Sequence, residues 1–136
     1  GYRGSVTRAA TQFNQLCQGN MDRMRTDTRT LLSEGLKLAA QTFEATGAAF
    51  GWVAGELDQF IIHQVSKVHT ESLVNVLGLD PDKVHAIYPH RGNIGPASVP
   101  FVLASVAEAG KLRKGDRVAL LGIGSGLNCS MAEVVW

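Results

Sequence analysis

Apolar residues recur at helical spacing in three parts of the chain. In the first they lie three or four positions apart, at Leu32, Leu36, Ala39 and Phe43. They therefore share one face of a long helix, which Asp27 or Thr28 can cap and which ends by Gly47 or Gly51. The same kind of pattern predicts a second helix over residues 67–77 and a third over residues 99–106.

Strands are predicted where β-branched and aromatic side chains are dense or alternate with polar ones. Residues 57–62, Leu-Asp-Gln-Phe-Ile-Ile, are typical of a buried strand, and residues 84–88 of a short one. Two more are expected over residues 117–123 and 128–136, whereas residues 89–96, with two glycines and two prolines, are expected to form a loop. Helices alternating with strands predict an α/β fold with a mixed sheet and packed helices.

The N-terminal segment differs from the rest of the chain. The first thirty residues hold five arginines and two aspartates, a local surplus of three positive charges, and residues 18–27 are mostly polar. We therefore divide the chain into an N-terminal element and connector, residues 1–27, and a main unit, residues 28–136. A short element is expected around residues 6–13. The arginines are expected to form a solvated surface.

Length and composition limit the possible functions. The 136 residues suffice for one domain, and 45% hydrophobic against 18% charged residues indicates a globular core. A net charge of +1 gives no electrostatic case for nucleic acid or an anionic membrane, and no apolar run approaches the ~18 residues of a membrane span. Two cysteines are too few for a disulfide framework, which favours the cytoplasm. The first residue is not methionine, so a fragment or processed piece is expected.

A glycine-rich segment at residues 120–126 follows a predicted strand, as nucleotide-binding loops do. Such a loop opens a helix and precedes an acidic residue about 20 positions on, but only ten residues follow Gly126 and they resemble a strand. Dinucleotide binding is therefore excluded. Two alternatives stay open: a turn that points the backbone N–H of Ser125 into a site, or a plain β-turn.

Two polar residues occupy positions that suit functional groups. His63 directly follows the predicted buried strand, and Asn93 lies in a Gly/Pro-constrained loop ahead of a helix, where a neutral amide is a fixed hydrogen-bond donor. A structural histidine and an asparagine in a left-handed turn are equally open alternatives. The remaining histidines and the cysteines lack metal-ligand spacing. Neither Cys17 nor Cys129 has the environment that activates a nucleophilic thiol.

Four short motifs occur in a fixed order along the chain. They are Ile62-His63-Gln64, residues 92–100 (Gly-Asn-Ile-Gly-Pro-Ala-Ser-Val-Pro), Lys114-Gly115-Asp116 and residues 122–127 (Gly-Ile-Gly-Ser-Gly-Leu). Together they resemble the C-terminal half of the thiolase superfamily, in its ketoacyl synthase III branch. Residues 6–10, 24–27 and 122–136 are similar to the enzymes of that branch that join two fatty acyl-CoA chains at the head of olefin biosynthesis.

The resemblance implies a fold and a set of roles. The family fold has five layers, αβαβα, built from two similar halves, of which this chain resembles the second. His63 and Asn93 would complete a Cys-His-Asn constellation whose nucleophilic cysteine belongs to the first half. The backbone N–H of Ser125 would join the oxyanion hole. Ser66 would contact the pantetheine arm of the substrate, although many members of the branch have asparagine there.

The implied activity is that of an acyltransferase. It would condense two fatty acyl-CoAs head to head, without decarboxylation, into a 2-alkyl-3-ketoacyl product. Coenzyme A is then part of the substrate, with no separate cofactor or metal, and the implied partners are the cysteine-bearing N-terminal half and a second protomer. Two alternatives remain: a decarboxylating 3-oxoacyl-ACP synthase III, and a non-catalytic scaffold subunit. Half a thiolase is expected to expose a large apolar patch and to associate with its missing half.

Overall fold

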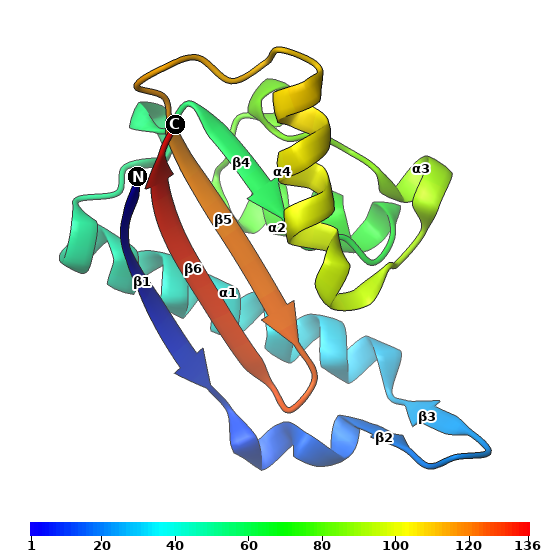
Figure 1. Ribbon diagram of the computed structural model, residues 1–136. Coiled ribbons are helices and arrows are strands. Elements are labelled where there is room, and N and C mark those ends of the chain that lie inside the picture. Colours follow the sequence, from blue (N-terminus) through cyan, green and yellow to red (C-terminus); the bar gives the residue numbers. More distant parts are fainter.

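The computed structural model describes all 136 residues as a four-stranded mixed sheet packed between helices, with a small hairpin at one end (Figure 1). Across the sheet the strands are β1 (Tyr2–Ala9), β6 (Asn128–Val135), β5 (Arg117–Gly124) and β4 (Gln59–Ile62). The hairpin consists of β2 (Cys17–Gly19) and β3 (Met24–Thr26). The α-helices are α1 (Thr28–Phe50), α2 (Lys67–Leu77), α3 (Tyr88–Arg91) and α4 (Ser98–Glu108). The predicted α/β class is confirmed.

The two faces of the sheet carry separate apolar cores. On β4, Phe60 and Ile62 pack with residues of α1 and α2, whereas Ile61, between them, packs with Val102 and Val106 of α4. Side chains alternate in this way because successive residues of a strand point to opposite faces. Helix α1 crosses behind the sheet and α4 covers its front over β4 and β5 (Figure 1). Burial on both faces explains the unbroken apolar run of this strand.

The direction of the strands brings the end of β4 and the end of β5 to one edge. β4 and β5 run parallel, with Ile62 opposite Leu121, while β5 with β6 and β1 with β6 are antiparallel. Parallel strands end on the same side of a sheet. The segments that follow β4 and β5 therefore emerge together.

Helix α1 begins and ends at residues that favour those positions. The Asp27 carboxylate accepts a hydrogen bond from the Thr30 backbone N–H at 3.1 Å, and the Thr30 hydrogen bonds lower the pKa of Asp27. At the other end Gly51 adopts φ = 66°, which closes the helix in the left-handed region. The predicted cap at Asp27 is confirmed, and the helix runs past Gly47 to Phe50.

The predicted strand over residues 84–88 is wrong. Only Val84 bridges β4, opposite Phe60, and the chain then turns into the one-turn helix α3. The reason is a side chain distant in sequence: Gln64 Oε1 accepts the backbone N–H groups of Ile87 and Tyr88, at 2.7 and 3.1 Å. These donors are then not free for a strand partner, and Pro89 favours a helix start. The predicted loop 89–96 consequently begins with helix.

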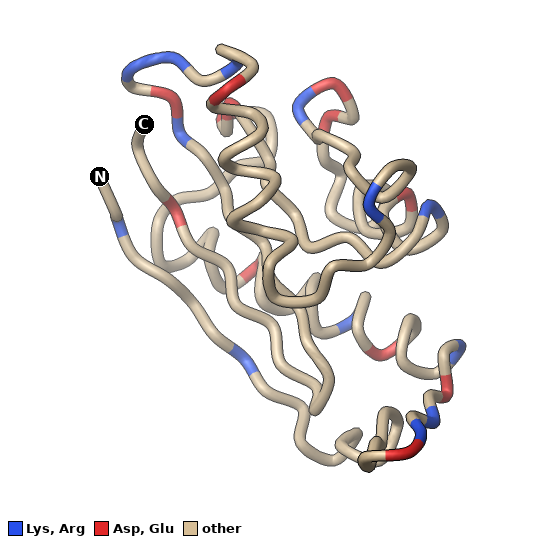
Figure 2. Tube along the Cα trace, turned by 45° about the vertical axis from the view of Figure 1, so that its right-hand side comes forward, with Lys and Arg blue, Asp and Glu red and all other residues tan.

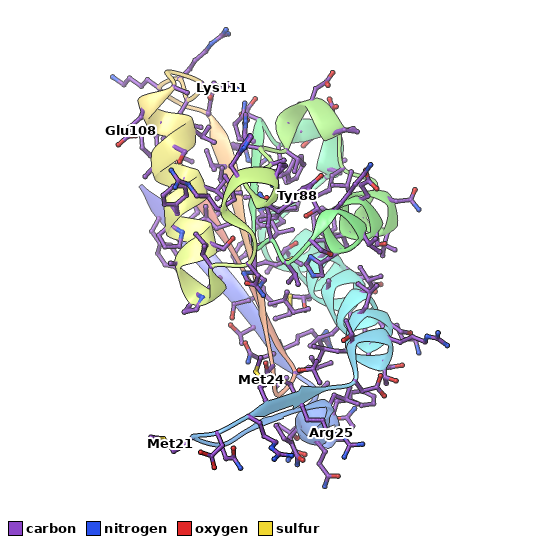
Figure 3. The ribbon with its side chains drawn as sticks, turned by 90° about the vertical axis from the view of Figure 1, so that its right-hand side faces the viewer. Met21, Met24, Arg25, Tyr88, Glu108 and Lys111 are labelled. Carbon is purple, nitrogen blue, oxygen red and sulfur yellow. The ribbon has the colours of Figure 1, made fainter.

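The N-terminal segment contributes to the main sheet. Residues 2–9 form β1, which pairs along β6, and the predicted element around residues 6–13 is in fact the end of β1 followed by a 3-10 helix, Thr11–Leu16. The predicted connector forms the β2–β3 hairpin, whose tip carries the fully exposed Met21 (Figure 3). Basic residues gather at the hairpin and the start of α1 (Figure 2), and the arginines of this segment are exposed, as predicted.

A buried charge cluster joins β5, β6 and the end of α1. The Glu133 carboxylate receives hydrogen bonds from Arg117 Nε and Nη2, at 3.0 and 3.1 Å, and from Trp52 Nε1 at 2.6 Å. The Arg117 hydrogen bond, ahead of the other contacts, lowers the pKa of Glu133. The carboxylate is therefore charged and fully paired inside the fold. No helix combines the length and hydropathy needed to cross a bilayer.

Candidate functional site

His63 occupies the first position after β4. Its backbone N–H donates to the carbonyl of Leu121 at 2.8 Å, so the pairing with β5 continues one residue beyond the strand and fixes the Cα of His63. Its ring is half-buried and meets the ring of His69 edge-on, with centroids 6.2 Å apart and an interplanar angle of 74°. Burial lowers the pKa of His63, and the backbone of Gly95 raises it by a smaller amount, so that the pKa is lowered on balance. The ring is therefore neutral at pH 7.

Asn93 lies in the loop that supplies the Gly95 contact. Gly92 and Gly95 adopt φ values of 62° and 59°, and the tight turn lets the Asn93 side-chain oxygen accept the Gly95 N–H at 2.9 Å. Because the carboxamide oxygen is engaged, the exposed NH₂ group is the part left to donate. Gly95 thus lies next to both residues, and the loop runs on to Ser98, whose hydroxyl accepts the Gln64 N–H at 3.1 Å, so the Asn93 loop lies beside the end of β4.

His69 supports the His63 ring from α2. Burial and then the nearby His63 lower the pKa of His69 to about 4, so this second imidazole is neutral as well. Ser66, the other residue singled out from the sequence here, caps α2, and its Oγ accepts the His69 N–H at 3.2 Å. With its oxygen engaged as a cap, the exposed hydroxyl of Ser66 retains its proton for donation.

Gln64 is a residue whose importance the sequence does not reveal. Its side chain is fully buried, and besides accepting from Ile87 and Tyr88 it donates from Nε2 to the His85 carbonyl at 2.5 Å. Its backbone N–H donates to the buried Ser98 Oγ at 3.1 Å, which links the end of β4 to the start of α4. The only signal in the sequence is that Gln64, like His63 before it, is polar at the end of an apolar strand.

Replacing Gln64 by alanine is expected to lower the free energy of unfolding by about 3 kcal/mol, because buried backbone groups at three positions lose their partners. Urea denaturation followed by circular dichroism measures the loss. Gln41→Ala, on the exposed face of α1, is the matched control and should change stability little. Equal effects of the two variants would contradict the role given to Gln64.

Ser125 lies in the turn between β5 and β6. The turn follows the C-terminal end of β5, on the same side of the sheet as His63, and Gly126 adopts φ = 127° within it. The Ser125 carbonyl accepts a hydrogen bond from Asn128 Nδ2 at 3.1 Å.

The two cysteines lie in different environments. Cys129 is buried in the sheet, where desolvation raises the pKa of its thiol. Cys17 is half-buried at the base of the hairpin, and hydrogen bonds from the Thr26 and Ser125 side chains lower the pKa of its thiol. Neither sulfur belongs to the group formed by His63, Asn93 and Gly95. The group formed by these residues therefore supplies hydrogen-bond donors.

The sequence matches the model of a known family, described as the C-terminal part of 3-oxoacyl-[acyl-carrier-protein] synthase III, over residues 48–136. The chain belongs to this family. The resemblance found in the sequence motifs is thereby confirmed. A solved structure of a protein named as such a synthase also superimposes closely on the chain, in agreement with the observed fold.

Individual relatives narrow the comparison. An acyl-CoA:acyl-CoA alkyltransferase of Xanthomonas campestris is 64% identical over 135 residues, 99% of this chain and 40% of that protein. A crystal structure of a protein named 3-oxoacyl-(acyl carrier protein) synthase III, FabH, from Xanthomonas oryzae has a TM-score of 0.96 at 64% identity, covering 99% of this chain and 40% of that one.

A second similar structure is Xanthomonas campestris OleA with bound cerulenin. Its TM-score is 0.96 at 64% identity, over 99% of this chain and 39% of that one. The chain thus spans about two fifths of the length of the relatives it matches.

Proposed function

We propose that the chain is the C-terminal catalytic part of an OleA-like acyltransferase, which condenses two fatty acyl-CoAs head to head without decarboxylation. The observation that carries this proposal is the 64% identity, over 99% of the chain, to a protein named acyl-CoA:acyl-CoA alkyltransferase. The position of the Asn93 loop beside the end of β4, where His63 lies, supports it from the geometry. The active enzyme would be a dimer in the cytoplasm, each protomer including the cysteine-bearing N-terminal half.

In the first step, the cysteine thiolate of the N-terminal half attacks the thioester carbonyl of one acyl-CoA. A new carbon–sulfur bond forms, the bond to coenzyme A breaks, and coenzyme A leaves as its thiol after taking up a proton. Negative charge develops on the carbonyl oxygen in between. The backbone N–H of Ser125, together with that of the cysteine, stabilises this oxygen by about 3 kcal/mol per donor.

In the second step, a base outside this chain removes the α-proton of a second acyl-CoA. The enolate oxygen accepts hydrogen bonds from the His63 ring and the Asn93 NH₂ group. The α-carbon then attacks the cysteine-bound thioester, so that a carbon–carbon bond forms and the cysteine leaves. The product is a 2-alkyl-3-ketoacyl-CoA. Ser66, with its free hydroxyl proton near the start of α2, is proposed to contact the pantetheine arm.

A decarboxylating 3-oxoacyl-ACP synthase III is the second candidate. The description of the family and the name of the similar Xanthomonas oryzae protein favour it. That reaction uses the same donors, but loss of carbon dioxide from a malonyl group generates its carbanion, and no α-proton is removed.

The assembled enzyme, given fatty acyl-CoA as its only substrate, is expected to form the 2-alkyl-3-ketoacyl product and to release no carbon dioxide. Mass spectrometry of the product and trapping of ¹⁴CO₂ from labelled malonyl-ACP separate the two candidates. Label released in step with product, together with no product from acyl-CoA alone, would establish the decarboxylating reaction instead.

A further inference from the structure

The side chain of Asn128 lies in the space left by two glycines of the β5–β6 turn. A Cβ placed on Gly124 would lie 3.4 Å from Asn128 Nδ2 and 3.5 Å from Oδ1, and one placed on Gly126 would lie 3.7 Å from Nδ2. From this position Nδ2 donates to the Ser125 carbonyl at 3.1 Å. The Asn128 carboxamide therefore lies beside Gly124 and Gly126 and holds the carbonyl of Ser125 between them by a hydrogen bond.

We infer that Asn128 is a positioning residue: by holding the Ser125 carbonyl it fixes the shape of the β5–β6 turn, so that the backbone N–H of Ser125, in the preceding peptide unit, keeps one direction toward the reacting carbonyl oxygen. The inference rests on the proposed function, which gives that N–H its part in the oxyanion hole. An oxyanion donor is effective only when it is aligned before the reaction, within about 10–20° of the productive direction. In a turn rich in glycine the backbone does not hold such a direction unaided, because glycine readily adopts other conformations.

The test uses the assembled enzyme, and measures coenzyme A thiol release from a fatty acyl-CoA as kcat and KM. Asn128→Ala removes the donor, and Asn128→Asp keeps the shape but cannot donate. We expect both to lower kcat about tenfold with KM changed less than about twofold, since a misaligned oxyanion donor affects the transition state rather than substrate binding.

Ser130→Ala is the matched control. Ser130 lies on β6, as Asn128 does, and its replacement removes an exposed hydrogen bond of 2.7 Å to Thr7 on β1. This variant should leave kcat unchanged. Thermal unfolding of every variant shows whether the fold is intact. An unchanged kcat in Asn128→Ala, or a loss in Asn128→Asp alone, would overturn the role of Asn128.

Variants of the donors themselves, His63→Ala and Asn93→Ala, are measured in the same assay. If they lose activity while the Asn128 variants keep it, the inference fails and the proposed function stands. If they keep full activity, the proposed function is wrong, and the inference that rests on it is wrong with it.

Discussion

Alanine at His63 is expected to lower kcat of the assembled enzyme by about a hundredfold or more, the loss usual for one oxyanion-stabilising donor. Asn93→Ala should cause a loss of similar size. Folding should be little affected, because His63 is only half-buried and Asn93 is exposed. The effect is therefore on the stabilisation of the enolate oxygen. The measurement is steady-state condensation of a fatty acyl-CoA, with product detected by mass spectrometry.

The chain offers controls of the same residue types. His90 in α3 and Asn75 in α2 are exposed, and their alanine variants should keep full activity. Full activity of His63→Ala and Asn93→Ala as well would mean that the chain is a non-catalytic scaffold. Because burial lowers the pKa of His63, its neutral form persists below the ordinary histidine range.

Removing the Glu133 carboxylate should have the largest effect on stability. Glu133→Ala leaves Arg117, whose side chain is 29% exposed, without its main partner, and also removes the acceptor of Trp52 Nε1. Breaking a buried pair by removing one member costs about 3 kcal/mol or more. What Arg117 keeps is a longer contact with the exposed Glu56 carboxylate, at 3.9 Å. Urea unfolding measures the change. Glu44→Ala, on the exposed face of α1, is the control and should be close to neutral.

The same cluster makes stability depend on acid. The pKa of Glu133 is lower in the folded than in the unfolded protein, so its contribution is fully present above the unfolded value of about 4.5 and is lost as the pH falls through the folded value. Glu133→Gln, which cannot titrate, should flatten the dependence of unfolding free energy on pH below that value. An acid dependence identical to that of the native protein would assign the effect to other carboxylates.

The elements that the sequence predicts well are those with a one-sided or fully buried pattern. β4 shows an unbroken apolar run because both of its faces are covered, and α1 shows its Asp27 cap. The face predicted for α1 is only partly right: of its four residues only Ala39 is buried, and the buried face of the helix runs through Gly35, Leu38, Thr42 and Thr46. β1 gives no comparable signal. It is an edge strand with mostly exposed side chains, and its position is set by pairing with β6 from the other end of the chain.

The residues of the candidate site could be predicted from the sequence, but the contacts between them could not. His63 could be singled out because it directly follows a buried strand, and Asn93 because glycine and proline surround it. That the Asn93 loop lies beside the end of β4 could not be predicted, since it depends on how the loop returns over the sheet. The buried hydrogen bonds of Gln64 join residues more than 20 positions apart in the chain, and no local pattern reports such links.

The most direct measurement is a crystal structure of the assembled enzyme whose cysteine carries an acyl chain, with a second acyl-CoA analogue bound. Our account predicts that a ring nitrogen of His63 and Nδ2 of Asn93 both lie about 3 Å from the thioester oxygen of the analogue, as in ordinary hydrogen bonds. An analogue oxygen held by other residues, with these two nitrogens turned to solvent, would contradict it.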